Sequence, residues 1–480
     1  MDSGLKQKTV SGMIWSFVQR FGVMIISFCS NLVLARLLTP DDYGLIGMLM
    51  IFILIANTFV DGGFGSALIQ KKDPTEEDYS TIFYWNLFLS VVLYILLFLC
   101  APYIARFYKL PLLSSVLRVQ GGVLILNSLS IIQQNRLRKQ LHFKQLSLVG
   151  IFSAFLSLVI TIYLAYLGWG VWALVAQQLL MSFFNAILYW IVGKWSPKLV
   201  FSTKSFKELF GFGGFILLSN LINTLCNNIQ GLLIGKFFSP HTMGLYSQAR
   251  KLEEVASTSL SSVVDQVSYP VLAEVQNDRM QMIKVIKKLI TSIAFFSFPA
   301  MLLLVVIAEP VIILLYSNKW VECTPYFQVL CVAGLAISLQ NINYYAVAAI
   351  GKSKALFNWT LIKRALSIIF IIVGFVLYGI WGLLIGMVMA SYAMYIINAL
   401  LVSRHIGYTL WQQFKDLLPI LLISVVSFSL AYFVSSIALS LVYGTILSVL
   451  IFVFSYVVLS CFFEREKIAL IKGILLRYKK

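Results

Sequence analysis

Two stretches of this chain, 200 residues apart, decide its fold. Residues 35–45 read ARLLTPDDYGL, and residues 235–245 read GKFFSPHTMGL. A cation, two apolar residues, a Ser or Thr, a Pro and a Gly-Leu pair recur in the same order. Such a segment ends one helix, turns and starts another, because Pro cannot continue a helix but suits the first position of a new one.

A second pair of similar stretches supports an internal repeat. Residues 170–174 read GVWAL, and residues 379–383 read GIWGL. Each is typical of a tight turn with a Trp at the membrane surface. Chance is the alternative explanation, since Pro, Gly and Trp are common in such turns. The length of the first match and its equivalent place in both halves favour duplication.

Composition places the chain in a membrane. The 480 residues are 60% hydrophobic and 12% charged, with a mean hydropathy of +0.89. Soluble domains are about 25% charged, so this chain has too few polar side chains to cover a water-exposed surface. Disorder is excluded because it requires low hydrophobicity and high charge. The sequence predicts an all-α polytopic membrane protein.

Uncharged runs between charged residues predict fourteen membrane-spanning helices. The runs 144–194, 364–404 and 416–464 each hold two spans, with turns at 168–170 and 378–379 in the first two. The region 243–267 is the least apolar span because it carries five charged residues. Single spans are expected near 10–36, 42–61, 78–106, 118–136, 208–236, 288–309 and 322–352.

The repeat unit covers six spans, which is an even number. Both halves therefore insert with the same orientation, and a pseudo-two-fold axis along the membrane normal relates them. We expect an N-terminal lobe over 1–205 (spans 1–6) and a C-terminal lobe over 206–408 (spans 7–12). Residues 409–480 hold spans 13 and 14, outside the repeat, and a basic tail.

The net charge of +18 is mostly an orientation signal. Of the 37 Lys and Arg residues, 26 fall in segments that are cytoplasmic if the N-terminus is cytoplasmic, and 5 fall in outer segments. Positive charge collects in cytoplasmic loops, so we expect both termini there and no nucleic-acid partner. The N-terminus lacks a clean apolar core and a cleavage site, so we expect an uncleaved first span.

Six cations lie in or near the spans. A charged side chain at the centre of a bilayer costs about 3 kcal/mol or more, so it should face a cavity or a partner. Arginine suits a pyrophosphate, because its planar fork pairs with phosphate oxygens and stays protonated. We expect an anionic substrate to be held by Arg20, Arg250, Lys251, Arg118, Lys363 and Arg364.

Each of these cations also has a structural explanation. Arg20 could pair with Asp61, and Arg250 could pair with Glu253 or Glu254 on its own helix. Arg118, Lys363 and Arg364 lie close enough to span ends to reach the membrane surface.

Amides and acids complete the candidate site. Asn220, Asn223 and Asn227 have the spacing of one helical face, where they could bind sugar hydroxyls or form interhelical hydrogen bonds. The acids that could carry a coupling proton or Na⁺ are Asp61, Glu253, Glu254 and Asp265. The glycines in Gly62-Gly63-Phe-Gly65, beside Asp61, suit a hinge or a broken helix. The scattered Cys and His residues have no metal-ligand spacing, so we expect no cofactor and no metal site.

The chain resembles a known transporter family. LKQKTVSGMIWSF, LARLLTPDDYGLIGM, DGGFGSALIQKKDPTEEDYST and LGWGVWALVAQQL are similar to bacterial polysaccharide-biosynthesis flippases. These are the O-antigen and colanic-acid exporters of the multidrug/oligosaccharidyl-lipid/polysaccharide superfamily. The resemblance is strongest over residues 5–290, and over the last two spans only hydropathy agrees.

The resemblance implies a fold and an activity. The fold is two six-helix lobes plus two helices, and in related lipid II flippases the extra pair forms a groove for the lipid tail. The activity is transfer of undecaprenyl-pyrophosphate-linked oligosaccharide across the bacterial inner membrane for lipopolysaccharide, capsule or exopolysaccharide synthesis. The implied partners are that substrate, membrane lipids and the polysaccharide polymerase or export machinery, and we expect a monomer.

Other functions fit the residues less well. A drug or cation antiporter of the same superfamily would need acidic cavity walls, whereas the intramembrane charges here are mainly basic. The loop IQKKDPTEED lacks the signature of the major facilitator class. A glycan polymerase or acyltransferase would need a large outer loop or embedded catalytic groups, so we expect no enzyme. A structural scaffold would not explain cations within spans.

Overall fold

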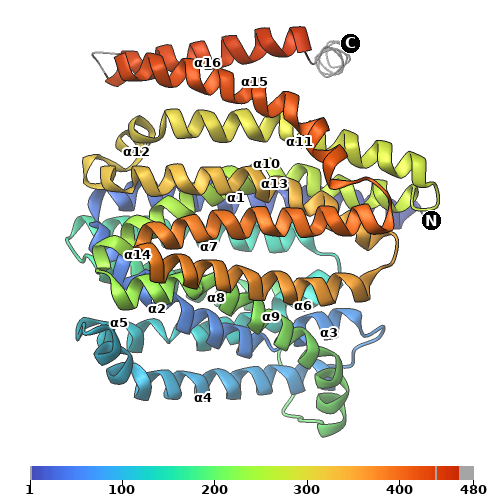
Figure 1. The fold of residues 1–480 in the computed structure, drawn as a ribbon. Coiled ribbons are helices and arrows are strands. Elements are labelled where there is room, and N and C mark those ends of the chain that lie inside the picture. Colours follow the sequence, from blue (N-terminus) through green and yellow to red (C-terminus); the bar gives the residue numbers. More distant parts are fainter. Residues whose placement is uncertain (1–2, 438–440, 464–480) are drawn as a thin grey trace. The chain divides into compact units, whose positions relative to one another are not determined.

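The computed structural model describes residues 3–437 and 441–463, and within these ranges the regular elements are helices (Figure 1). The chain forms two compact units, Met1–Gly244 and Leu245–Lys480. The all-α prediction is therefore confirmed for the described residues. The predicted lobe boundary at 205/206 stays a prediction, because the compact units reflect packing and the lobes reflect the sequence repeat.

The first unit is built from helices that pack in sequence-distant pairs, among them α1 with α7, α6 with α8 and α2 with α9. Its helices are α1 (Ser3–Leu37), α2 (Pro40–Asp61), α3 (Phe64–Gln70), α4 (Glu76–Tyr108), α5 (Leu112–Gln120), α6 (Val123–Lys139), α7 (Phe143–Tyr166), α8 (Val171–Gly193) and α9 (Thr203–Phe237). Helix α10 (Pro240–Glu274) begins in this unit and continues into the second.

The repeated Ser/Thr-Pro segments form the predicted turns. Thr39 caps α2, and its side chain and that of Asp42 each bond the other residue's backbone N–H. In the second copy, the Ser239 hydroxyl accepts a hydrogen bond from the backbone N–H of Thr242 at 3.2 Å. A capping hydroxyl followed by Pro satisfies the free N–H groups of a helix start, which explains why this pattern recurs.

The two turns also contact each other reciprocally. A Cβ on Gly44 would overlap the backbone of Pro240, and a Cβ on Gly244 would overlap the backbone of Pro40. The equivalent glycine of each copy therefore lies against the equivalent proline of the other copy. Only glycine permits backbones to approach this closely, which accounts for the Gly in both copies.

Helix α2 is broken where the sequence predicts flexibility. It ends at Asp61, and Gly62 and Gly63 both have positive φ, at 58° and 70°, before α3 begins. A Cβ on Gly63 would collide with the carbonyl oxygen of Gly213 on α9. The break thus serves a turn and a close backbone contact, and the predicted broken helix is confirmed.

The second unit contains the remaining helices. They are α11 (Arg279–Val306), α12 (Ala308–Tyr316), the short 3₁₀ helix η1 (Asn318–Cys323), α13 (Thr324–Ala349), α14 (Ser353–His405), α15 (Leu410–Ile437) and α16 (Leu441–Phe463). Helix α13 packs against α11 and α14, α15 also packs against α11 and α14, and α15 lies beside α16 (Figure 1).

Helix α14 is two helices joined at a break. Its 53 residues would extend about 80 Å if straight, far beyond a hydrocarbon core of about 30 Å. The backbone leaves helical geometry at Tyr378 and Gly379. On either side, Gly374 and Gly382 have their backbones in mutual contact. The predicted turn at Tyr378–Gly379 is confirmed, as is the turn at Gly168–Trp169–Gly170 between α7 and α8.

The predicted number of membrane-spanning helices can be compared with the helical segments of the structure. Among the described residues, 12 helical segments are long and apolar enough to cross a membrane, and one of them is the broken segment Lys354–His405. Dividing that segment adds one more span. Helix α10, the charged span of the sequence prediction, is absent from the set because of its polarity. The count of fourteen therefore stays a prediction that depends on α10.

Candidate functional site

Arg20 is an exposed cation in an apolar part of the chain. It lies within the apolar segment Ile14–Leu37 of α1, and its side chain is exposed. Among the residues that the structure describes, none forms an ion pair or hydrogen bond with Arg20. The suggested pairing with Asp61 is therefore not formed. An unneutralised guanidinium within an apolar segment is the arrangement expected of a group that waits for an anion.

The amides of α9 divide into two kinds. Asn220 is exposed and Asn223 is half-buried, and neither side chain forms a hydrogen bond with any described residue. Asn227 is exposed and engaged in an interaction, and its backbone carbonyl also accepts a hydrogen bond from the Gln230 side chain. Interhelical bonding thus does not explain Asn220 and Asn223, whose amides remain available to hydroxyl groups.

Polar contacts that the sequence did not predict join α9 and α6 to α2. The hydroxyls of Thr58 and Thr224 lie 3.2 Å apart. The Asn127 amide donates to the Asn57 side chain at 3.0 Å. Sequence offers little signal for such pairs, because residues 57 and 127 are brought together only by packing.

A charged cluster around the start of α4 was also missed. The Lys71 ammonium lies 3.0 Å from Asp78 and 3.1 Å from Glu208 of α9. Burial lowers the pKa of Lys71, but hydrogen bonds to the two carboxylates outweigh burial and raise this pKa above 10.5, the usual lysine value. Arg136 pairs in the same region with Glu76 at 3.3 Å.

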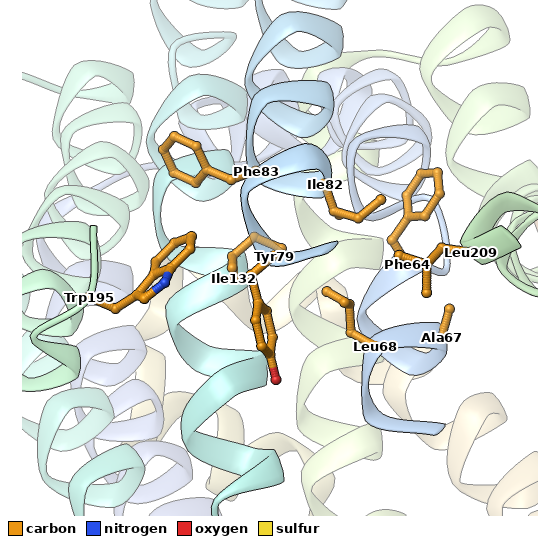
Figure 2. Packing of buried hydrophobic residues seen from close by; sticks show 9 residues of the cluster. All are labelled: Phe64, Ala67, Leu68, Tyr79, Ile82, Phe83, Ile132, Trp195 and Leu209. Carbon is orange, nitrogen blue, oxygen red and sulfur yellow. The ribbon is translucent and has the colours of Figure 1, made fainter. Parts of the chain in front are cut away.

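This cluster borders an apolar cluster that includes Phe64, Phe83, Trp195 and Leu209 (Figure 2). The Trp195 indole N–H donates to Glu76 at 2.5 Å. The ion pairs and the apolar packing together tie α3, α4 and α6 to the first turns of α9. These charged residues therefore have structural partners.

Charged residues of α10 form a second candidate site. Arg250 lies 3.4 Å from Glu253 and 2.9 Å from Glu254, so the predicted structural pairing is formed. Glu253 is fully buried, whereas the Glu254 side chain is 53% exposed. Lys251 is exposed and engaged in interactions of its own. Asp265, the remaining acid proposed for this helix, has a side chain outside the described residues.

Lys363 is buried in the second unit beside neutral groups. Its ammonium donates to the Asn398 side chain at 2.8 Å and lies 5.7 Å from the Tyr344 ring centre. The Asn398 amide in turn donates to the backbone carbonyl of Gln340 at 3.1 Å. Arg364, the next residue, is half-buried and engaged elsewhere. The expectation that Lys363 reaches the membrane surface does not fit its 8% exposure.

The other candidates are less suited to bind a ligand. Arg118 on α5 lies over the Phe98 ring at 4.4 Å and donates to the Phe98 carbonyl at 3.3 Å. Asp61 is half-buried at the end of α2, with Arg138 as its charged neighbour. Within the described residues, no group of His, Cys, Asp and Glu has the arrangement of a metal site.

An apolar pocket of about 570 Å³ lies within the second unit. Helices α11, α13, α14 and α15 surround it, and its wall includes Leu339, Trp411, Phe414 and Leu418. The volume falls within the range of about 300–1,000 Å³ typical of small-ligand sites. Such a lining suits a hydrocarbon chain and offers little to a charged ligand.

Comparison with known sequences places these features in context. Residues 33–325 match the family described as "Polysaccharide biosynthesis protein". Teichuronic acid biosynthesis protein TuaB of Bacillus subtilis is 29% identical over 74% of each chain. Lipopolysaccharide biosynthesis protein WzxC of Escherichia coli is 25% identical over 88% of this chain and 87% of its own length.

Solved structures share the fold. The lipid II flippase MurJ in its inward closed conformation has a TM-score of 0.77, with 16% identity, over 95% of this chain and all of that chain. A multidrug resistance transporter of the MATE family has a TM-score of 0.56, also with 16% identity, over 83% of this chain and 98% of that chain. At this identity the likeness establishes the fold alone.

Proposed function

Because this chain belongs to the polysaccharide biosynthesis protein family, we propose that it is a flippase for an undecaprenyl-pyrophosphate-linked oligosaccharide. The chain is a multi-pass membrane protein, and we place it in the bacterial cytoplasmic membrane with both termini in the cytoplasm. Its substrate would cross by alternating access, with no covalent chemistry. Among the relatives, TuaB is named for teichuronic acid biosynthesis and WzxC for lipopolysaccharide biosynthesis. ExoT of Rhizobium meliloti is named as a succinoglycan biosynthesis transport protein.

The single observation that carries this proposal is Arg20, which has no partner among the described residues. A pyrophosphate must leave water to cross a membrane, and an unpaired anion there is strongly unfavourable. The Arg20 guanidinium can form two parallel hydrogen bonds to phosphate oxygens. Arginine also keeps its charge in an apolar environment. Substrate and protein would thus each supply the counter-charge that the other lacks.

The free amides suit the sugar portion of the substrate. Asn220 and Asn223 can each donate and accept hydrogen bonds, which matches the hydroxyl groups of an oligosaccharide. Their lack of partners among the described residues supports this role. Amides carry no charge, so they would bind a sugar weakly enough for it to be released.

The pocket in the second unit suits part of the prenyl chain. Its wall is formed by apolar side chains of four helices. Burial of an apolar chain contributes about 0.8 kcal/mol per methylene. Enclosing a few isoprene units would therefore help to retain the lipid while its polar portion moves.

Deletion of the gene tests the proposal. We expect the mutant to lose surface polysaccharide and to accumulate undecaprenyl-linked oligosaccharide on the cytoplasmic leaflet. The leaflet is assigned by treating intact spheroplasts with a glycosidase that cannot enter, since trapped substrate is protected until the cells are opened. Normal surface polysaccharide together with greater sensitivity to cationic drugs would instead identify an antiporter and contradict the proposal.

A further inference from the structure

Glu253 is a fully buried acid whose carboxylate is poorly compensated. In the described part of the chain, both carboxylate oxygens are buried without a well-formed hydrogen bond, and the Ser257 hydroxyl one turn along α10 supports the charge only weakly. Its ion pair with Arg250 is long, at 3.4 Å, while the same guanidinium approaches Glu254 at 2.9 Å. A buried carboxylate with so little support is costly in its charged form. Uptake of a proton would remove that cost.

Among the described residues, Arg250 is the one cation that acts on Glu253. On α10 the groups that act on it are Arg250, the uncharged Ser257 hydroxyl and Glu254. On α13 its neighbours are Gly334 and the titratable but neutral Cys331. On α11 the neighbour at this point is the uncharged Met301, which also contacts Gly334. The state of Glu253 therefore depends chiefly on Arg250.

Arg250 itself remains accessible. Its side chain is 30% exposed, and a guanidinium has five N–H donors, of which the hydrogen bond to Glu254 uses one. A pyrophosphate that approaches Arg250 would bring at least as much negative charge as Glu253 does. Two anions on one guanidinium repel each other, and the buried one can escape this repulsion by taking up a proton.

We propose that Glu253 and the pyrophosphate of the substrate compete for Arg250, so that protonation of Glu253 and binding of pyrophosphate favour each other. The inference rests on the proposed function. In this scheme the Glu253 carboxylate takes one proton from solvent and becomes a neutral acid, while Arg250 stays charged. Release of the pyrophosphate restores the ion pair and returns the proton. Each substrate movement is thereby linked to one proton.

The linkage has a measurable size. If one proton is taken up on binding, affinity should fall up to tenfold for each unit rise in pH. The probe is a farnesyl-pyrophosphoryl-N-acetylglucosamine, because both of its phosphates are esterified and stay ionised throughout the range tested. Any pH dependence then belongs to the protein.

The experiment is calorimetric titration of the full-length protein in detergent, in buffers of different ionisation enthalpy, between pH 5.5 and 8.5. We expect the wild type to take up close to one proton on binding the probe. Glu253→Gln, which mimics the neutral acid, should bind with undiminished affinity and without proton uptake. Glu254→Gln is the matched control, since it removes the exposed partner of Arg250, and it should keep the proton uptake.

The outcomes separate the two proposals. If the wild type binds the probe without proton uptake, or if Glu253→Gln takes up as many protons as the wild type, the competition is disproved while the flippase stands. If the wild type does not bind the probe at any pH, the proposed substrate is itself wrong. Should Glu253→Gln fail to fold, the wild-type proton count still decides, because a count near zero overturns the inference.

Discussion

At the scale of single residues, the contacts of each cation distinguish those that stabilise the fold from those that are available to bind a substrate. Arg118, Lys71 and Arg136 each have partners in the structure, on an aromatic ring or on carboxylates. Arg20 has none among the described residues. Counting cations in the sequence could not make this distinction, because it depends on which side chains packing brings within reach.

Arg20→Ala should abolish surface polysaccharide when the variant is expressed in the deletion strain, because the pyrophosphate loses its counter-charge. Arg20→Lys should retain part of the activity, since lysine keeps the charge without the fork of donors. Polysaccharide is quantified on whole cells, and the membrane level of each variant is measured by immunoblot. Arg106→Ala, which removes an exposed arginine on α4, should complement fully. Full complementation by Arg20→Ala would remove Arg20 from the site.

Gly63→Ala should destabilise the protein by about 1–3 kcal/mol, because alanine is strained at positive φ and its methyl would meet the Gly213 carbonyl. Gly211→Ala is the control, since Gly211 lies on α9 with open space around it. That change should be neutral or slightly stabilising. The thermal midpoint of each purified variant in detergent makes the comparison. Equal midpoints for the two variants would contradict a constrained turn at Gly63.

At the scale of elements, α9 is held to the first unit at several points along its length. Its first turns join the charged cluster through Glu208 and the apolar cluster through Leu209, and farther along Thr224 meets Thr58. The repeat instead assigns this helix to the second half of the sequence. Sequence similarity therefore identifies the ancestry of a helix, and packing identifies its neighbours.

The two carboxylates that pair with Lys71 should contribute different amounts to the free energy of unfolding. Asp78→Asn should cost about 1–3 kcal/mol, because Asp78 is buried and also accepts a bond from the Thr75 backbone. Glu208→Gln should cost less than about 1 kcal/mol, since this carboxylate is exposed. Thermal midpoints at neutral pH test the order. A larger loss from Glu208→Gln would show that burial does not set these energies.

The same cluster has a predictable pH dependence. The pKa of Lys71 is raised in the folded state, so its contribution is fully present below the unfolded value near 10.5 and is lost as pH rises through the folded value. The difference in thermal midpoint between wild type and Lys71→Met should hence be constant at neutral pH and shrink in strong alkali. If the difference in thermal midpoint already shrinks as the pH is raised from 7 to 9, the pKa of Lys71 is not raised in the folded state.

Filling the apolar pocket should impair transport. Leu418 lines the pocket, and Leu418→Trp would occupy space proposed for the prenyl chain. Leu422→Trp makes the same change one turn along α15 at an exposed position outside the lining. We expect reduced surface polysaccharide with the first variant and normal amounts with the second, at equal membrane levels. Equal activity of both would exclude the pocket from the lipid path.

At the scale of the whole molecule, α10 determines the topology. If α10 crosses the membrane, Ser239 and Gln276 lie on opposite sides, with Ser239 outside. In separate variants with the native cysteines replaced by alanine, an impermeant maleimide should label Ser239→Cys on intact cells. Gln276→Cys should react only after the cells are opened. If both cysteines are labelled from outside, α10 does not cross the membrane. The number of spans is then one lower, and the helices after α10 have the opposite orientation.

Sequence alone could anticipate the breaks in this chain better than its contacts. The Thr-Pro and Ser-Pro turns, the Gly62–Gly63 break and the Tyr378–Gly379 break all follow from local backbone chemistry, which residue type determines. The poor compensation of Glu253 and the bond from Lys363 to Asn398 could not be foreseen. Both features depend on how each helix is rotated about its axis. The sequence of a span is the same whether a polar residue faces a partner or an open space.

The reciprocal contact of Gly44 with Pro240 and of Gly244 with Pro40 has the form of a homodimer interface. In such an interface each residue of a pair occurs once on either side, so the surface is complementary to itself. If the two halves arose by duplication, a half-length ancestor that carried this turn could have paired with a second copy of itself. Each half would then have been free to diverge, except that neither glycine can be replaced without displacing the other half's proline.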